Sequence, residues 1–106
     1  GNVVLRDRKV LSEDGIFIVA ITVNRREKKI IAKARVHTRG FVYLKKSRDI
    51  LRESTELVNQ TVEDYLQGED FDWADLKGKV RDNLAKFLFE QTKRRPAILP
   101  VVMEAK

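Results

Sequence analysis

The chain has no cysteine, one histidine, two prolines and one tryptophan among its 106 residues. Without cysteine it can form no disulfide framework and no thiolate site. A zinc site needs three or four converging ligands, so we expect His37 to be an exposed strand residue and not a metal ligand. No apolar run approaches the roughly 20 residues that span a bilayer, and no signal-peptide pattern opens the chain. These absences predict an intracellular, cytoplasmic protein without a membrane span.

Motifs that carry catalysis are also missing from the sequence. It contains no glycine-rich phosphate loop and no Ser-His-Asp grouping. The many acidic side chains fall on expected helix faces, where solvation and pairing along the helix explain them. We therefore expect no catalytic residue, no metal ligand and no cofactor in this chain, and no enzyme made of it alone.

What the chain does contain is an ordinary globular mixture with an uneven charge. Apolar residues make up 42% and charged residues 36%, which suits one small domain over residues 1–106. Residues 1–46 carry a net charge of +8, residues 47–92 carry −5, and residues 93–106 carry +3. Two explanations fit this split equally well. Either a basic face binds nucleic acid, or two oppositely charged layers or molecules pack together.

The first half of the chain predicts an antiparallel hairpin. Residues 16–24 are rich in β-branched and aromatic side chains, as in a strand buried on both faces or nearly so. Residues 25–28 have the length of a hairpin connection. Residues 29–37 alternate, with one face formed by Lys29, Lys33, Arg35 and His37 and the other by Ile30, Ala32, Ala34 and Val36. The outer face of the hairpin is therefore expected to be strongly cationic.

The second half predicts two helices. The first covers residues 48–67, with Ser47 as its N-cap and Gly68 as the residue that closes it. The second begins near Asp72, which can cap it. The apolar stripe of the first helix is expected at Leu51, Leu57, Val58, Thr61, Val62 and Tyr65. The stripe of the second is expected at Trp73, Leu76, Val80, Leu84, Phe87, Leu88 and Gln91.

Residues 92–100, TKRRPAILP, mark a switch from helix to strand. Cations complement the negative end of a helix, and the proline stops the helix from continuing. A final strand is expected at 98–103, with Pro100 placing it at a sheet edge. Residues 1–14 fit a helix or an arm next to a linker. The expected fold is thus a small α/β domain of the α+β kind. It has a three-stranded mixed sheet, β-β-α-α-β order and both helices on one face.

Candidate contact residues lie in three places. Arg35 belongs to the cationic hairpin, and Arg39 and Phe41 flank Gly40 just after it. Arg39 can reach a phosphate or a partner carboxylate, whereas Phe41 can either stack on a base or fill the core. The cations Lys93, Arg94 and Arg95 either complete the helix end or bind a partner. Arg6 and Arg8 either form internal ion pairs or contact a preceding domain.

Several separated motifs give a resemblance to a known family. They are residues 4–8 (VLRDR), 11–15 (LSEDG), 39–42 (RGFV), 92–96 (TKRRP) and 98–100 (ILP). In this order they resemble the C-terminal domain of bacterial ribonuclease J over essentially the whole chain. The run at 41–46, FVYLKK, looks more like the second paralogue of Gram-positive cocci than the first.

The resemblance implies a parent protein that degrades and processes RNA. Such proteins combine a metallo-β-lactamase core, an inserted β-CASP domain, a linker and this domain. They act as zinc-dependent 5′-to-3′ exonucleases and as endonucleases, and no residue here matches their zinc motifs. The resemblance implies that this domain supports assembly with itself or with a paralogous subunit and reaches RNA through the parent. The alternative from the residues is an autonomous RNA-binding module that uses the basic hairpin face.

Overall fold

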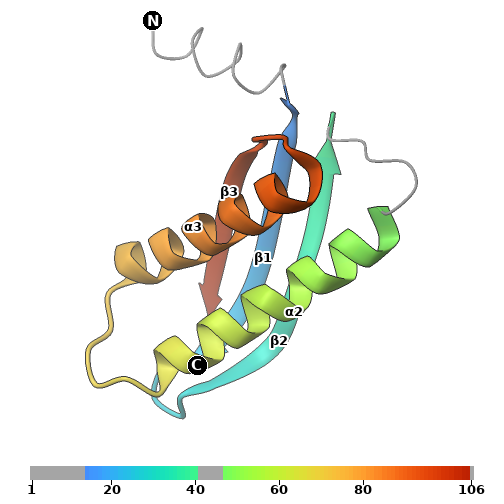
Figure 1. Ribbon diagram of the computed structural model, residues 1–106. Coiled ribbons are helices and arrows are strands. Elements are labelled where there is room, and N and C mark those ends of the chain that lie inside the picture. Colours follow the sequence, from blue (N-terminus) through green and yellow to red (C-terminus); the bar gives the residue numbers. More distant parts are fainter. Residues whose placement is uncertain (1–13, 41–46, 106) are drawn as a thin grey trace, which may run out of the picture.

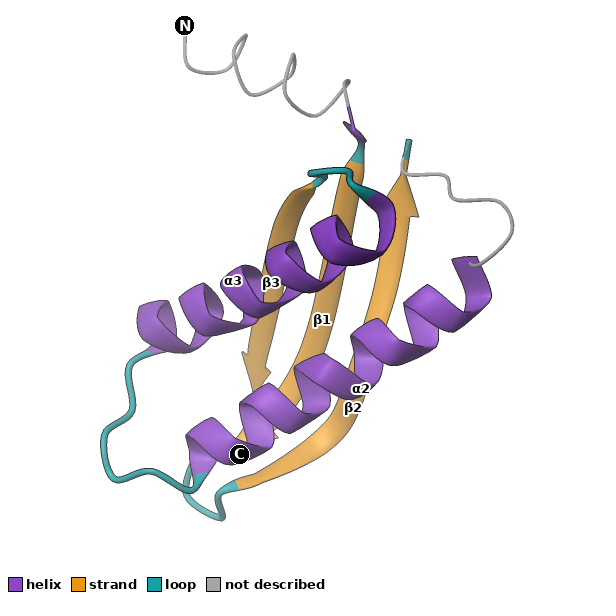
Figure 2. Cartoon of the chain, in the orientation of Figure 1, coloured by secondary structure: helices purple, strands orange, loops and turns teal. Residues whose placement is uncertain are grey.

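The computed structural model of the protein describes residues 14–40 and 47–105. Its elements follow the order β1 (Ile16–Asn24), β2 (Lys29–Arg39), α2 (Ser47–Leu66), α3 (Trp73–Thr92) and β3 (Ala97–Glu104). β1 is the central strand, antiparallel to β2 and parallel to β3. Figure 1 shows α2 and α3 side by side over one face of the sheet, and Figure 2 shows the same two layers by element type. The predicted order, mixed sheet and one-sided helix layer are confirmed.

Some predicted features lie outside the described residues. They are the helix or arm at 1–14, apart from Asp14, and the candidates Arg6, Arg8 and Phe41. α2 begins at Ser47. The proposed cap at Ser47 stays a prediction, because its side chain is outside the described set as well.

The core lies between β1 and the two helices. Phe17, Val19, Ile21 and Val23 of β1 are almost completely buried, and the residues between them are half-buried. This alternation follows from the two-residue period of a strand, which points every second side chain toward the helix layer. We expected β1 to be buried on both faces or nearly so. The face toward the helices is almost completely buried, and the other face is half-buried.

The helices bury rows of residues spaced four apart. α3 buries Leu76, Val80, Leu84 and Leu88, all of which the sequence predicted, whereas Gln91 is exposed. In α2 the buried row is Ile50, Ser54, Val58, Val62 and Leu66. Side chains at i and i+4 stack on one face of a helix, so a single row meets the sheet. The predicted α2 stripe was centred to one side of this row and omitted three of its members.

The start of α3 is as predicted, whereas the last turns of α2 and α3 differ in detail from the expected pattern. Asp72 caps α3 as predicted, because its carboxylate accepts the N–H of Ala74 at 3.0 Å. α2 ends at Leu66, and the N–H of Gly68 bonds the carbonyl of Tyr65 in a tightened last turn. α3 is closed by Lys93, which has φ of 60° and donates its N–H to the carbonyl of Phe89. A lysine therefore occupies the left-handed position that glycine usually fills.

β2 is interrupted in its middle by register shifts. The pairing with β1 is regular from the Ile16–Arg39 pair to the Ala20–Arg35 pair. The register then shifts twice, once before and once after the Thr22–Ala32 pair. Ala32 is exposed, so the predicted alternation fails here. An extra residue in one strand of a pair changes which side chains face each layer, and sequence periodicity does not show it. The side chain of Asn59 in α2 accepts the N–H of Ala34 at 2.8 Å in this region.

The charge split of the sequence corresponds to the two layers. The acidic residues 47–92 form the helices and their connection, and the strands come from the basic flanks. α2 packs mainly on β2, and α3 packs on β3. Among the described residues, none of the ion pairs joins a helix to a strand. The two layers therefore direct their opposite charges outward and are held together by apolar packing.

Candidate interaction surfaces

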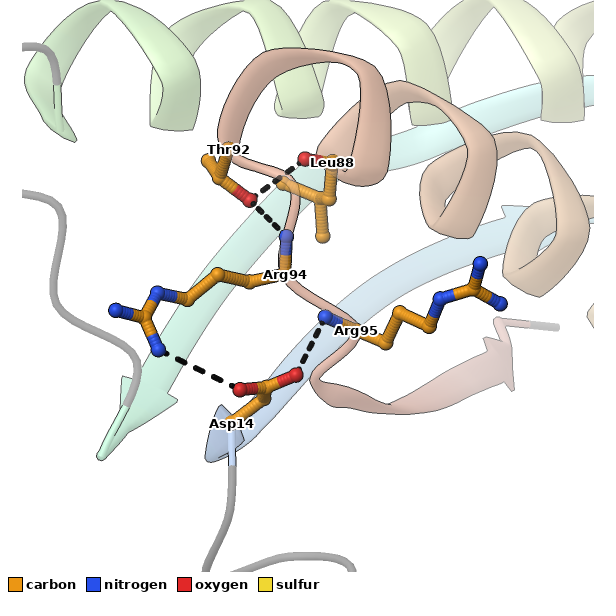
Figure 3. Close-up of polar contacts among 5 residues, drawn as sticks. All are labelled: Asp14, Leu88, Thr92, Arg94 and Arg95. Atoms are coloured by element: carbon orange, nitrogen blue, oxygen red, sulfur yellow. Dashed lines mark hydrogen bonds and ion pairs between the residues drawn. The ribbon is translucent and has the colours of Figure 1, made fainter.

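One end of the sheet brings together residues from three distant parts of the sequence. The carboxylate of Asp14, just before β1, accepts the backbone N–H of Arg95 at 2.8 Å. Its other oxygen lies 3.5 Å from a guanidinium nitrogen of Arg94. Figure 3 shows Asp14 between these two residues, with the guanidinium groups directed away from each other. The helix-to-strand switch is thus fixed to the start of β1.

The cations that follow α3 also have partners within the domain. The side chains of Lys93 and Arg95 both lie over the ring of Phe89, at 5.3 and 4.4 Å from its centroid. Thr92 donates its hydroxyl to the carbonyl of Leu88 and accepts the N–H of Arg94 (Figure 3). Each predicted contact cation therefore has an internal role, although all three remain exposed at the surface. Of the two predicted alternatives for Lys93, Arg94 and Arg95, these contacts favour completion of the helix end over binding of a partner.

Two glycines complete this end of the sheet. Gly15 and Gly40 have φ of 87° and 70°, in the region that side chains rarely adopt. A Cβ added at Gly40 would lie 3.4 Å from the Cα of Gly15. The carbonyl of Gly15 also accepts the N–H of Ala97 at the start of β3. Residues from three of the family motifs therefore meet at this end of the sheet. The motifs are those at 11–15, 39–42 and 92–96, and the contacts involve their described residues.

The sheet face opposite the helices carries an apolar row on β3. Leu99, Val101 and Met103 are 46%, 41% and 47% exposed. Their partners in β1 are Ile18, Ala20 and Thr22, which are half-buried. Paired residues of neighbouring strands point to the same side of a sheet, so these six side chains form one surface. We call this surface the apolar face.

A cationic row borders the apolar face. Arg39, His37 and Arg35 of β2 are exposed and pair with Ile16, Ile18 and Ala20 of β1. They therefore point to the same side as the apolar face, two strands away from β3. The described strand residues that share this side include no carboxylate. We call Arg35, His37 and Arg39 the β2 strip.

Each open edge of the sheet is interrupted at one described position. In β3 the N–H groups of Ala97 and Ala105 donate to Gly15 and Val23, beside and at the end of β1. Because donors alternate sides along a strand, Pro100 faces the open edge, where it has no N–H to offer. This confirms the edge position predicted for Pro100. On β2 the N–H of Ala34 is already taken by Asn59. Edge-to-edge pairing with another chain is therefore disfavoured on both sides.

The helix layer holds a groove of the opposite charge. It has a volume of about 650 Å³ and lies between α2, α3 and their connection. Its carboxylates are Asp64, Glu69, Asp70 and Asp75, against the single cation Lys79. Partial burial raises the pKa of the Tyr65 phenol at its rim, and the nearby Asp75 carboxylate contributes to the rise. The groove is thus unsuited to an anionic ligand.

The remaining predictions about chemistry concern His37 and metals. His37 is exposed, as expected for a strand residue. Within residues 14–40 and 47–105, no three His, Cys, Asp or Glu side chains gather as metal ligands would. Neither described helix is long and apolar enough to cross a membrane. The exposure of Leu99, Val101 and Met103 was not predicted, although the alternating positions in 98–103 would have been the signal for it.

The fold and its surfaces define a small α+β domain that offers faces for contact. The chain belongs to the ribonuclease J C-terminal domain family, which matches residues 3–105. It is 76% identical over 106 residues to Ribonuclease J 2 of Streptococcus pyogenes serotype M3, covering 100% of this chain and 19% of that protein. It is 48% identical over 104 residues to Ribonuclease J 2 of Staphylococcus aureus, covering 98% and 19%. The predicted resemblance is confirmed, and both relatives bear the name of the second paralogue.

Proposed function

We propose that this chain is the assembly domain of a ribonuclease J and joins its parent to another ribonuclease J subunit. The supporting observation is the apolar face, where three large side chains remain more than 40% exposed on the side of the sheet that no element within residues 14–40 and 47–105 covers. Exposed apolar side chains that lie together on one surface are typical of protein contact sites. Because each edge is interrupted by one position that cannot pair, we place the contact on the apolar face itself. The partner is a second copy or the paralogous subunit.

The parent's chemistry belongs to the same proposal. The chain spans 19% of the length of its relatives, whose names describe ribonucleases. We infer that the parent hydrolyses RNA, as a 5′-to-3′ exonuclease and as an endonuclease, with zinc held by residues outside this chain. The domain by itself is not catalytic. Incubating it with labelled RNA and zinc should leave the RNA intact, and specific cleavage that survives further purification would contradict this part.

Sedimentation velocity tests the assembly role. Val101 lies at the centre of the β3 row, so Val101→Asp places a charge in the middle of the contact. Burying an unpaired charge is costly, and we expect self-association to weaken at least tenfold (about 1.4 kcal/mol or more). The matched control is Ala85→Asp, which adds the same charge at an exposed position of α3 and should associate like the unaltered chain.

The result that contradicts the proposal is equally clear. An unaltered chain that stays monomeric over the whole concentration range, alone and mixed with the paralogous domain, would remove the assembly role. If Val101→Asp and Ala85→Asp associate equally well, the contact does not lie on the apolar face. Thermal melting of each variant by circular dichroism shows whether it has folded.

A further inference from the structure

The β2 strip has the properties of a site for an extended polyanion. Arg35, His37 and Arg39 are exposed, and none of them takes part in an ion pair with a described residue. Their partners in β1 are Ala20, Ile18 and Ile16, which offer no compensating charge. Most described lysines and arginines of this chain have no ion pair, so what distinguishes the strip is that its three donors lie side by side on one face. They face solvent together, with no carboxylate among the described strand residues on that side.

The spacing of the strip suits a regular chain of phosphates. Alternate residues of a strand lie about 6.7 Å apart on one face. This is close to the separation of neighbouring phosphates along an extended single strand of nucleic acid. Arginine binds phosphate through two parallel N–H groups, and the imidazole of His37 adds a further donor between the two guanidinium groups.

The rest of the domain directs an anion to this side. The opposite layer carries the acidic groove around Asp64 and Asp75, which repels phosphates. The β2 strip lies two strand spacings, roughly 10 Å, from the β3 row. Its partners Ile18 and Ala20 belong to the apolar face, so the strip forms the rim of that face, and the polar rim of a protein contact is the part that solvent reaches. An acidic peptide could not pair with β2 at Ala34, because Asn59 occupies that N–H.

We propose that the β2 strip binds the phosphate backbone of single-stranded RNA. The choice of RNA rests on the proposed function of the parent, whereas the site itself rests on the strip. No Phe, Tyr or Trp side chain lies on this face among residues 14–40 and 47–105, so His37 is the one described side chain there with a ring that can stack on a base. The binding is therefore expected to be independent of sequence. Oligouridylate and oligoadenylate of equal length should bind alike.

Fluorescence anisotropy with labelled oligouridylate of about 20 nucleotides tests the proposal on the 106-residue chain. We expect the double substitution Arg35→Gln/Arg39→Gln to weaken binding about tenfold at low salt. It should also reduce the slope of log K against log salt by about 1.4, since each lost phosphate contact on a single strand contributes about 0.7. The charge-retaining Arg35→Lys/Arg39→Lys should keep most of the affinity, because lysine still binds phosphate as a point charge.

The matched control is Lys77→Gln/Lys86→Gln. It removes the same charge from exposed positions of α3 and should change the affinity less than twofold. Equal weakening by the strip and control variants would reduce the effect to net charge and overturn the proposal. Absence of RNA binding by the unaltered chain at low salt would do the same.

Sedimentation of the same samples separates this inference from the assembly role. The strip variants leave β3 untouched, so they should associate like the unaltered chain. A strip variant that loses self-association but keeps its RNA affinity would make the strip a protein contact and overturn RNA binding. A monomeric chain that still loses RNA affinity on strip substitution would end the assembly proposal and leave the RNA site standing.

Discussion

At the scale of single residues, the end of the sheet depends on unusual backbone positions. Lys93 holds the left-handed position that closes α3, with φ of 60°. A side chain with a Cβ pays roughly 1–2 kcal/mol in this region, because the Cβ approaches the following carbonyl. Its ammonium group lies over Phe89, and a cation–π contact at an exposed site recovers about 0.5–1 kcal/mol. The contact therefore offsets about half of the backbone cost, which helps a lysine to be tolerated there.

Substitution of Lys93 separates these two effects. Lys93→Gly removes the strain and the cation, whereas Lys93→Ala removes only the cation. We expect the glycine variant to be about 1 kcal/mol more stable than the alanine variant, and close to the unaltered chain. Urea denaturation measures the difference. An alanine variant as stable as the glycine variant would show that Lys93 is not in the left-handed region.

At the scale of elements, β2 depends on α2 to complete its hydrogen bonding. The register shifts around Thr22 and Ala32 interrupt the ladder, and Asn59 accepts the N–H of Ala34 close by. An unsatisfied buried N–H costs about 1–3 kcal/mol. The side-chain amide of one helix residue therefore both stabilises the irregular part of the strand and blocks its open edge.

Asn59→Ala should lower the free energy of unfolding by about 1–3 kcal/mol, because Ala34 loses its acceptor. The control Gln60→Ala removes an exposed amide from the next position of α2 and should cost less than about 0.5 kcal/mol. Urea denaturation measures both, and hydrogen exchange follows the Ala34 amide directly. Unchanged protection of that amide in the Asn59 variant would contradict its role as the acceptor.

The same element shows what the sequence could and could not predict. The hairpin, both helices and the final strand follow from hydrophobic period, caps and Pro96, whereas the pairing of that strand parallel to β1 is seen in the structure. The shifts in β2 do not, because periodicity contains no information about an extra residue in one strand. The buried row of α2 was misplaced because it contains Ser54, a polar residue with no hydrogen-bond partner for its hydroxyl in the described structure.

The candidate site was predictable only in part. The sequence identified Arg35, Arg39 and the cations at 93–95, but not their partners. Asp14 and Arg95 are 81 residues apart, and no local pattern connects them. The resemblance motifs gave the family without showing that they meet at one end of the sheet. Arg94 and Arg95 proved to be engaged with Asp14 and Phe89 there, whereas Arg35 and Arg39 remain free of ion pairs with the described residues.

At the scale of the whole molecule, the domain has two unlike sides. The helix layer is acidic and hollowed by a groove, and the sheet side combines the apolar face with the β2 strip. Both explanations of the charge split thus have a counterpart in the structure. The layers carry opposite charge, and the basic one faces outward. Under our proposals, the sheet side joins a subunit and meets RNA at its rim, while the acidic helix side repels RNA.

The central claim is that the apolar face joins two copies of the domain. An isotope-filtered nuclear Overhauser experiment on mixed labelled and unlabelled chain tests it most directly. We expect contacts between copies at the methyl groups of Leu99, Val101 and Met103, and their loss in Val101→Asp. Contacts that arise instead from the methyl groups of α2 or α3, or no contacts at any attainable concentration with a second copy or with the paralogous domain, would contradict the account.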